Sequence, residues 1–459
     1  MRIILKNTIT IPDISESLKK LLSGRLTIQN PKWIENNRQG RWNKGVPKML
    51  EFFSDNSEGY EVPRGYMRQL INECHHNDIA FTIDDRRHAP GEKSFSFGGE
   101  LKPFQKVACD DVLKKHFGVL TAPTGAGKTV MMLSIIAQRK QPALIVVHTK
   151  DLASQWINRI ETFLGIPESE IGFIGSGKFS IGEKITVAMV QTLYKKAAET
   201  APHIGNIIVD ECHRTPSRTF TEALKAFDCY YMTGLSATPF RRDKLSKLIF
   251  WHLGDVVHEI DKRHLVNSGD ILRAEIIIRE TPFFTNTDPV MYYSKVMSEL
   301  TEDNARNTLI AEDIAKESVD SSGVCLVLSD RKAHCERIRS LLKLDHNIDA
   351  DILTGDLGSS ERKEVLERLE SDGIRVLIAT SQLLGEGFDS TKLSTLFLIY
   401  PIKFSGRLTQ YLGRILRPGD TSKKARVFDY VDRQVGVLEA AAKSRMYVYS
   451  SENVINYSE

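Results

Sequence analysis

The sequence predicts an α/β protein in which two parallel-sheet domains follow a small α+β region at the N-terminus. Three observations support this fold class. The 459 residues are too many for one compact core. Strand and helix signals alternate regularly after about residue 100, fade near residue 250 and resume after residue 304. Before residue 90, short β-like runs surround a basic stretch that is rich in asparagine.

These signals divide the chain into five predicted parts. Residues 1–90 form the N-terminal domain, and residues 91–100 form a polar, turn-rich linker. Residues 101–259 and 304–459 form the two parallel-sheet domains. Residues 260–303, where the alternation is weak, form a connector between them.

In the first sheet domain, five apolar runs predict strands and two apolar-faced stretches predict helices. The predicted strands are Val119–Thr121, Ala143–Val147, Ile185–Val190, Ile207–Asp210 and Tyr231–Leu235. The predicted helices are Thr129–Gln138 and Leu152–Leu164. Because strands that are apolar throughout are buried on both faces, we expect a parallel sheet covered by helices on both sides.

The second sheet domain shows the same alternation. Its predicted strands are Val324–Leu328, Ala350–Leu353, Arg375–Ala379, Thr395–Ile399 and Arg426–Val431. Its predicted helices are Arg331–Lys343, Glu361–Glu370 and Leu408–Leu416. At the start of the chain, Met1–Thr10 alternates like one strand and lacks the apolar core of a signal peptide.

Composition sets limits on the function. Apolar residues make up 41% and charged residues 26% of the chain, which is ordinary globular usage. The net charge is only +3, so contact with nucleic acid must come from local basic patches. None of the six cysteines forms a Cys-x-x-Cys pair, so we expect no structural zinc and a reducing compartment. No apolar run is long enough to span a bilayer, and a cytoplasmic protein is expected.

The segment Ala122–Thr129 stands between a predicted strand and a predicted helix, which is the context of a phosphate-binding loop. Glycines allow backbone N–H groups to turn toward phosphate oxygens, and the helix adds its positive N-terminal end. Lys128 should reach the β- and γ-phosphates, and the Thr129 hydroxyl should bind Mg²⁺. The full set of expected phosphate-loop residues is Thr124, Gly125, Ala126, Gly127, Lys128 and Thr129. A Gly-rich turn before a helix is the alternative.

A second segment, Asn206–His213, is an apolar strand that ends in two adjacent acids. Asp210 is expected to hold the Mg²⁺ shell, and Glu211 to orient and deprotonate the attacking water. His213 is placed to sense the state of the phosphates. The alternative is a polar strand end without a catalytic role, which the phosphate loop earlier in the chain disfavours. Together the two segments predict hydrolysis of a nucleoside triphosphate with Mg²⁺, and the resemblance described next implies that it is ATP.

From about Leu101 to Asp432, these and further motifs resemble superfamily 2 helicases of the DExH type. The resemblance implies two RecA-like motor domains that face a common cleft. Ala122 stands where the general phosphate loop has Gly, as in the helicase variant of the loop. Lys102–Gln105 resembles the adenine-recognising segment, so Gln105 is implied to read the base.

Other segments of the first domain match motifs that this family uses for strand contact and coupling. His148–Leu152 and Gln191–Thr192 resemble segments that hold the nucleic-acid backbone, and Ser236–Thr238 resembles the motif that couples hydrolysis to strand movement. The residues that carry these implied roles are Thr149, Lys150, Gln191, Thr192, Ser236 and Thr238.

The second domain carries the remaining motifs. Ala379–Asp389 resembles a segment that contacts both backbone and nucleotide, and Gln410–Arg417 resembles the final motif. The residues implied to contact the nucleic-acid backbone are Arg331, Thr380 and Ser381, and those implied to contact the nucleotide are Gly387 and Asp389. Gln410 is implied to couple hydrolysis to strand movement. Arg414 and Arg417 are implied to reach the γ-phosphate. Arginines supplied by a second domain make hydrolysis depend on closure of the cleft. The alternative is that both arginines lie on a solvated helix face, because residues three apart share one side of a helix in either case.

Within the superfamily, the sequence is most similar to the XPB-like and UvsW-like branch. Arg241-Arg242-Asp243 resembles an Arg-Glu-Asp element of XPB-like helicases, with Arg242 in place of the acid, and a surface turn is the alternative. In Asn30–Gly45, cations alternate with aromatics: Trp33, Arg38, Arg41, Trp42 and Lys44. Cations neutralise phosphates and aromatics stack on bases, so this stretch is expected to bind DNA. The alternative is a hairpin with buried Trp side chains and solvated charges.

The function expected from this resemblance is an ATP-dependent DNA helicase that unwinds or branch-migrates forked and branched DNA. A duplex DNA translocase without unwinding, an RNA helicase, and a binding protein with an inactive motor are the alternatives. The resemblance implies travel from 3′ to 5′, a monomer as a sufficient unit, and the host cytoplasm if the origin is a phage.

Overall fold

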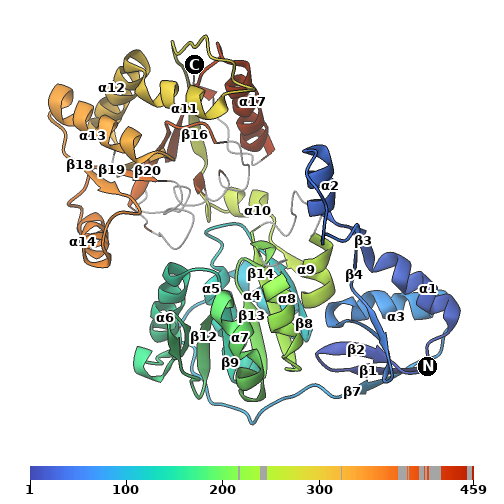
Figure 1. The fold of residues 1–459 in the computed structure, drawn as a ribbon. Helices are drawn as coiled ribbons and strands as arrows, with labels where there is room; N and C mark the ends of the chain where they lie inside the picture. The colour runs from blue at the N-terminus through green and yellow to red at the C-terminus, as the bar shows by residue number, and fades with distance from the viewer. Residues whose placement is uncertain are drawn as a thin grey trace. The chain divides into compact units, whose positions relative to one another are not determined.

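The computed structural model describes residues 1–214, 218–237, 246–321, 323–380, 390, 392–402, 408, 411–412, 425–451 and 457–458. The chain divides into two compact units (Figure 1). One unit comprises Met1–Ala122 and Gly127–Ile260, and the other comprises Pro123–Ala126 and Asp261–Glu459. The predicted fold class, two parallel-sheet domains after a small α+β region, is confirmed. The five predicted boundaries stay predictions.

The N-terminal part of the first unit is a five-stranded sheet in the order β5-β6-β2-β1-β7. Its strands are β1 (Arg2–Leu5), β2 (Thr8–Ile11), β5 (Ser54–Asn56), β6 (Gly59–Pro63) and β7 (Thr82–Asp85). Helices α1 (Glu16–Arg25) and α3 (Met67–His76) accompany it. Apolar side chains of the strands and helices, among them Ile9, Leu22 and Tyr60, form the core.

The predicted single strand Met1–Thr10 is wrong. The chain turns at Lys6 and Asn7, where Lys6 N donates to Thr8 O at 2.9 Å, and β1 pairs antiparallel with β2. Two polar residues inside the run interrupt the alternation, and both resulting strands bury their apolar side chains in the same core.

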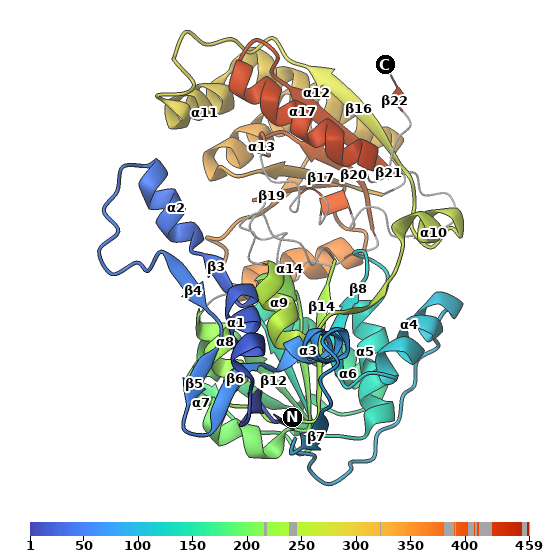
Figure 2. The same ribbon diagram turned by 90° about the vertical axis from the view of Figure 1, so that its right-hand side faces the viewer.

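A segment between α1 and β5 forms an arm, defined here as residues 27–51. Two short antiparallel strands, β3 (Thr27–Gln29) and β4 (Met49–Glu51), form its base. Beyond them lie α2 (Pro31–Arg38) and a loop (Figure 2). The Asn30 side chain caps α2 and also donates to Pro47 O at 2.8 Å, which closes the loop onto the helix start.

The rest of the first unit is an eight-stranded sheet in the order β11-β10-β12-β9-β13-β14-β8-β15, parallel except for β11. Its strands are β8 (Phe117–Thr121), β9 (Ala143–Val147), β10 (Gly172–Gly175), β11 (Lys178–Phe179), β12 (Ile185–Met189), β13 (Asn206–Val209), β14 (Tyr231–Ser236) and β15 (Val256–Glu259). Its α-helices are α4 (Pro103–Leu113), α5 (Lys128–Arg139), α6 (Lys150–Leu164), α7 (Val190–Thr200), α8 (Arg218–Lys225) and α9 (Ser246–Leu253).

Helices cover both faces of this sheet, as predicted. Figure 2 shows α4, α5 and α6 on one side and α7 and α8 on the other. The central strands are buried along their whole length, which is why they read as continuous apolar runs. The parallel register brings the carboxyl ends of β8, β9, β13 and β14 to one edge. Residues that follow these strands in the sequence therefore lie near one another.

The N-terminal region packs directly against α9. Trp251 of α9 joins the core of the N-terminal sheet, and its ring lies 5.3 Å from the ring of Phe52. Arg64, which is 3% exposed, donates to Cys229 O at 2.8 Å. At Gly65, any side chain would lie 2.3 Å from Phe250 O, so only glycine permits this approach. These contacts fix the N-terminal region to the first motor sheet.

The second unit contains a seven-stranded, all-parallel sheet in the order β18-β19-β17-β20-β21-β16-β22. Its strands are β16 (Ala274–Glu280), β17 (Val324–Ser329), β18 (Ala350–Leu353), β19 (Val376–Thr380), β20 (Leu393–Leu398), β21 (Ala425–Val431) and β22 (Tyr457–Ser458). Its helices include α10 (Lys262–Asn267), α11 (Tyr293–Glu302), α12 (Asn304–Asp320), α13 (Lys332–His346), α14 (Ser359–Glu370) and α17 (Gly436–Ser451).

Strand β16 lies inside the segment predicted as a connector. Its seven residues pair with β21 along its full length, so this segment contributes to the second sheet. Across the described ranges, no helix is both long and apolar enough to cross a membrane. No group of three or more His, Cys, Asp and Glu side chains that could hold a metal was found in that same part of the chain.

Candidate active site

The predicted phosphate loop joins β8 to α5. Gly125 and Gly127 have φ angles of +89° and +80°, a region that favours glycine. Gly127 is also the N-cap of α5, and a side chain there would lie 2.4 Å from Gln105 Nε2. The φ angle therefore favours glycine at residue 127, and any side chain there would displace the end of the Gln105 side chain. The loop places backbone N–H groups and a helix N-terminus together, which is the arrangement that binds phosphate.

Lys128 and Thr129 begin helix α5, directly after the loop. Lys128 Nζ donates to Ala122 O at 3.0 Å, so its side chain folds back along the loop. Ala122 in turn is fixed by its N–H bond to Ser236 O at 3.0 Å. The ammonium thus lies within the loop that it is predicted to serve.

Gln105 lies against this loop from α4. It is 7% exposed, and its Oε1 accepts from Lys102 N at 2.9 Å across the first turn of the helix. The same side chain approaches Gly127. The structure therefore brings the predicted base-reading residue to the predicted phosphate loop.

Asp210 and Glu211 follow β13 at the same edge of the sheet. The Asp210 carboxylate is 7% exposed and accepts from Trp156 Nε1 at 2.8 Å and from Glu211 N at 2.9 Å. Burial, followed by the charge of Glu211, raises the pKa of Asp210 to about 6, whereas the Trp156 bond and the Lys128 charge act in the opposite direction. A cation bound here would relieve this unfavourable environment.

Glu211 has a left-handed backbone conformation, with φ of +48°. Such conformations cost about 1–3 kcal/mol in non-glycine residues and concentrate at functional sites. The Glu211 carboxylate lies 3.1 Å from His213 Nδ1, and the same nitrogen lies 3.1 Å from Ser236 Oγ. Glu211, His213 and Ser236 therefore form one polar chain that joins the ends of β13 and β14. One predicted coupling residue, His213, is thus in contact with the predicted general base, and a second, Ser236, is linked to that base through His213.

The residues present fit Mg²⁺. This cation binds through one or two carboxylates, a hydroxyl, phosphate oxygens and water rather than through a dedicated protein cage. Thr129 offers a hydroxyl, and Asp210 offers a carboxylate whose charged form is disfavoured by burial and by the neighbouring charge of Glu211. The donor set is therefore that of a Mg²⁺–nucleotide site.

Four predicted backbone-binding residues lie after β9 and β12, whose parallel pairing aligns Val147 with Met189. Thr149 caps α6, and Lys150 is the first residue of that helix. Gln191 Nε2 donates to His148 O at 2.9 Å, and Thr192 is the next residue of α7. Gln191 therefore links the two segments.

In the second unit, Arg331 and Thr380 lie at the ends of paired strands, since Ser329 aligns with Thr380. The Arg331 guanidinium donates to Ser298 Oγ at 2.9 Å and to Ser294 O at 3.1 Å. Thr380 is 8% exposed. The remaining predicted site residues lie outside the described residues: Thr238, Ser381, Gly387, Asp389, Gln410, Arg414 and Arg417.

In the arm, neither tryptophan is buried, so the alternative of a hairpin with a tryptophan core is wrong. Trp42 is 85% exposed, with Lys44 Nζ 5.7 Å from its ring centre. Trp33 on α2 is half-buried under Lys48, whose Nζ lies 5.4 Å from the ring centre. Arg38 and Arg41 are exposed.

The asparagines of this stretch hold its loop in shape. Asn36 Nδ2 donates to Asn43 Oδ1 and Asn43 Nδ2 donates to Asn37 Oδ1, each at 3.0 Å. Arg41 N donates to Asn36 O at 2.8 Å. The loop that carries Trp42 is therefore fixed by side-chain amides rather than by a core.

Sequence reasoning missed one residue that holds a site carboxylate, Trp156, and one buried cation that ties helix α5 to the sheet, Arg139. Trp156 holds Asp210, and its position on the apolar face of α6 gave no sign of a role beyond the core. Arg139, at the end of α5, is 7% exposed and donates to Asn206 Oδ1 and to Thr233 Oγ1, each at 3.1 Å. A charged residue closing an otherwise apolar helix was the available signal for Arg139.

Comparisons with known proteins bear on this site. Residues 98–241 match the family described as "Type III restriction enzyme, res subunit", and residues 304–419 match "Helicase conserved C-terminal domain". The two matches follow one another in the order of a helicase motor and together span more than half of the chain. The chain belongs to the superfamily 2 helicases. It is accordingly an ATP-hydrolysing enzyme of the helicase type.

The helicase is similar to the "DNA 3'-5' translocase XPB2" of Sulfurisphaera tokodaii, with 26% identity over 73% of this chain and 82% of that protein. Its fold is that of S. cerevisiae Dbp5 in a structure titled as bound to RNA and ADP BeF3, with a TM-score of 0.56 and 14% identity over 78% of this chain and 89% of that one. The structure of T4 UvsW aligns over 98% of both chains at 19% identity, with a TM-score of 0.45.

Proposed function

We propose that this helicase is an ATP-dependent DNA helicase that unwinds or branch-migrates forked and branched DNA. The observation that carries the proposal is the arm, which presents an 85% exposed tryptophan among exposed cations on the unit that holds the acid pair. An exposed aromatic costs free energy in water and binds unpaired bases well. Residues 1–90 would then act as a DNA-binding domain attached to the motor.

ATP hydrolysis would take place between the phosphate loop and the acid pair. The backbone of the loop and Lys128 would bind the phosphates, with Gln105 at the base. Glu211 would accept the proton of the attacking water. Bound Mg²⁺, held by Thr129 and Asp210, would neutralise charge on the phosphate oxygens. Arg414 and Arg417 of the second domain, with Gly387 and Asp389, would complete the site when the domains close.

Coupling would run through the chain of Glu211, His213 and Ser236. A change at Glu211 during hydrolysis alters the hydrogen bond that His213 shares with the end of β14. Thr238 comes two residues after the end of β14 in the sequence, and Gln410 would respond from the second domain. The cycle of closure and opening would then move the strand.

The backbone of one strand would be held at the carboxyl edge of each sheet. Thr149, Lys150, Gln191 and Thr192 would serve in the first domain, and Arg331, Thr380 and Ser381 in the second. Backbone contacts carry no base information, so specificity would be for DNA structure rather than sequence. The name of the Sulfurisphaera relative supports DNA as the substrate and 3′ to 5′ travel.

A second candidate is a duplex DNA translocase that does not separate strands, because the same relative is named a translocase. Two assays on the same protein separate the candidates. Displacement of a labelled strand from a fork supports the helicase, whereas displacement of a triplex-forming strand without any unwinding supports the translocase. ATP hydrolysis stimulated by RNA and not by DNA would contradict both.

A further inference from the structure

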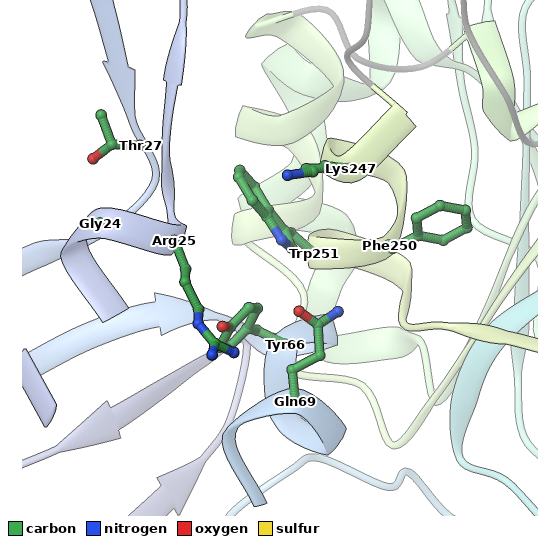
Figure 3. Close-up of a pocket in the computed structure, with 8 residues that line it drawn as sticks. All are labelled: Gly24, Arg25, Thr27, Tyr66, Gln69, Lys247, Phe250 and Trp251. Carbon is green, nitrogen blue, oxygen red and sulfur yellow. The ribbon is translucent and has the colours of Figure 1, made fainter. Parts of the chain in front are cut away.

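A pocket of about 320 Å³ lies where the N-terminal region meets the first motor sheet. Gly24 and Arg25 at the end of α1 and Tyr66 and Gln69 line it from the N-terminal side. Lys247 and Trp251 of α9 line it from the motor side (Figure 3). No residue that lines this pocket has an individual role in the proposed function.

The pocket has an aromatic floor and a cationic rim. Tyr66 and Trp251 are almost fully buried and form the floor, whereas Arg25 and Lys247 are exposed at the rim. Arg25 forms an ion pair with Glu73 but keeps half of its side chain exposed. Lys247 has no ion-pair partner among the residues that the structure describes. An anion attached to a flat apolar group matches both features.

The pocket also lies at the foot of the arm. Thr27, which lines it, is the first residue of β3, and β3 leads to α2 and the exposed Trp42. A strand that crosses the arm can therefore reach the pocket without leaving the same unit of the protein. This continuity favours nucleic acid over an acidic peptide as the occupant.

We propose that this pocket binds one unpaired nucleotide of a nucleic-acid strand at a fork junction. The phosphate lies between Arg25 and Lys247, and the base enters toward Tyr66 and Trp251. A volume of about 320 Å³ lies within the range of small-ligand sites and suits one nucleotide. Because one wall of the pocket belongs to the N-terminal region and the other to α9 of the motor domain, the bound nucleotide contacts both and links recognition of the junction to the motor. This assignment rests on the proposed function and names a further site for it.

Gly24 provides a test that removes no charge. An added Cβ would meet no atom within 4 Å, and Gly24 is helical, so a larger side chain is accommodated. Gly24→Leu should fill the pocket mouth, and because leucine favours helix over glycine it should not unfold α1. Gly24→Ala is the matched control, since it adds one methyl group and leaves most of the pocket open. Lys247→Gln is a second, independent variant on the other wall.

The experiment measures equilibrium binding by fluorescence anisotropy at fixed salt, with two probes. One probe is a fork with a single unpaired nucleotide at the junction, and the other is a blunt duplex of the same length. We expect Gly24→Leu and Lys247→Gln to bind the fork about tenfold more weakly, with Gly24→Ala and blunt-duplex binding unchanged. Thermal unfolding of each variant checks that it is folded.

Three results would overturn the assignment. Wild-type fork affinity in Gly24→Leu rejects the pocket, and equal losses on fork and duplex reject the unpaired nucleotide. Unchanged fork binding together with saturable, Gly24→Leu-sensitive binding of an acidic aromatic peptide would make the pocket a protein-docking site. Failure of the proposed function looks different, because wild-type protein would then not prefer the fork over the duplex.

Discussion

The acid pair and the arm, two regions with proposed roles, are built in opposite ways. Asp210 is buried and held by Trp156 and by backbone, and Glu211 is connected to His213 and Ser236. In the arm, Trp42, Arg38 and Arg41 are exposed and only the loop beneath them is fixed, by asparagine amides. The chemistry proposed for the first region requires one residue type at each position, whereas the DNA contact proposed for the second requires only a cationic and aromatic surface. Substitutions should therefore act all-or-none in the first region and gradually in the second.

The largest effect is expected from Glu211→Gln. The amide keeps the size of the side chain and cannot accept a proton, so hydrolysis should fall by about 10²–10⁴-fold while ATP binding is kept. Single-turnover hydrolysis together with nucleotide affinity measures both. Normal hydrolysis would show that another group activates the water, and Glu211 would then not be the general base.

Lys128→Ala should reduce ATP turnover by about 10²–10³-fold, because the phosphates lose their direct cation. DNA binding without nucleotide should be nearly unchanged. Lys106→Ala, an exposed lysine on α4, is the control of equal charge change. Steady-state hydrolysis at saturating ATP is the measurement, and turnover equal to wild type would contradict the phosphate-site assignment.

Replacing Arg38, Arg41 and Lys44 together by Ala should weaken fork binding by about 10–100-fold near physiological salt. The slope of log affinity against log salt should become shallower by about 2 to 3, because each lost phosphate contact contributes about 0.9. ATP hydrolysis without DNA should not change. Lys6, Lys178 and Lys195, all exposed elsewhere on the first unit, form the control triple. An unchanged salt slope would show that the three arm cations make no contact with DNA phosphates.

Trp156→Phe tests whether the buried site depends on its support. Phenylalanine keeps most of the packing but loses the 2.8 Å bond to Asp210. Outer partners of a metal ligand are worth about 10–100-fold in metal affinity, so the Mg²⁺ concentration for half-maximal hydrolysis should rise about tenfold. An unchanged Mg²⁺ dependence would mean that Trp156 serves only the core.

The smallest effect is expected from Trp42→Ala. Base stacking on an aromatic contributes about 1–3 kcal/mol, so fork affinity should fall at least about fivefold with an unchanged salt slope. Trp33→Ala is the internal comparison, because Trp33 is already half-buried under Lys48. Equal losses from both variants would show that the two tryptophans act through the shape of the arm.

The same contrast explains what the sequence could predict. The central strands of both motor sheets are buried on both faces, so their apolar runs located them to within a few residues, as for Ala143–Val147 and Val324–Ser329. The loop and the acids were identifiable because phosphate chemistry fixes their residue types and spacing. The approach of Gln105 to Gly127 then followed from the fold.

Features that depend on distant contacts were not predictable. Strand β16 has only a short apolar run, Ile276–Ile278, between charged residues, and its pairing with β21, about 150 residues later in the chain, makes it part of the sheet. The hydrogen bond from Arg64 to Cys229 O joins residues 165 positions apart, and the sequence around Arg64 does not predict it. In the arm, residue types indicated either DNA contact or a core; the exposure of Trp42 excludes a core position for that side chain, and DNA contact stays a prediction.

The central claim is that a superfamily 2 motor is directed to branched DNA by its arm. The most direct measurement is steady-state ATP hydrolysis with no nucleic acid, single strand, plain duplex, fork, four-way junction and RNA, for wild type and for the variant lacking Arg38, Arg41 and Lys44. We predict that forks and junctions stimulate wild type most, and that the variant needs more fork for half-maximal stimulation while reaching the same maximal rate. Strongest stimulation by RNA or by plain duplex, or identical fork dependence in the two proteins, would contradict the claim.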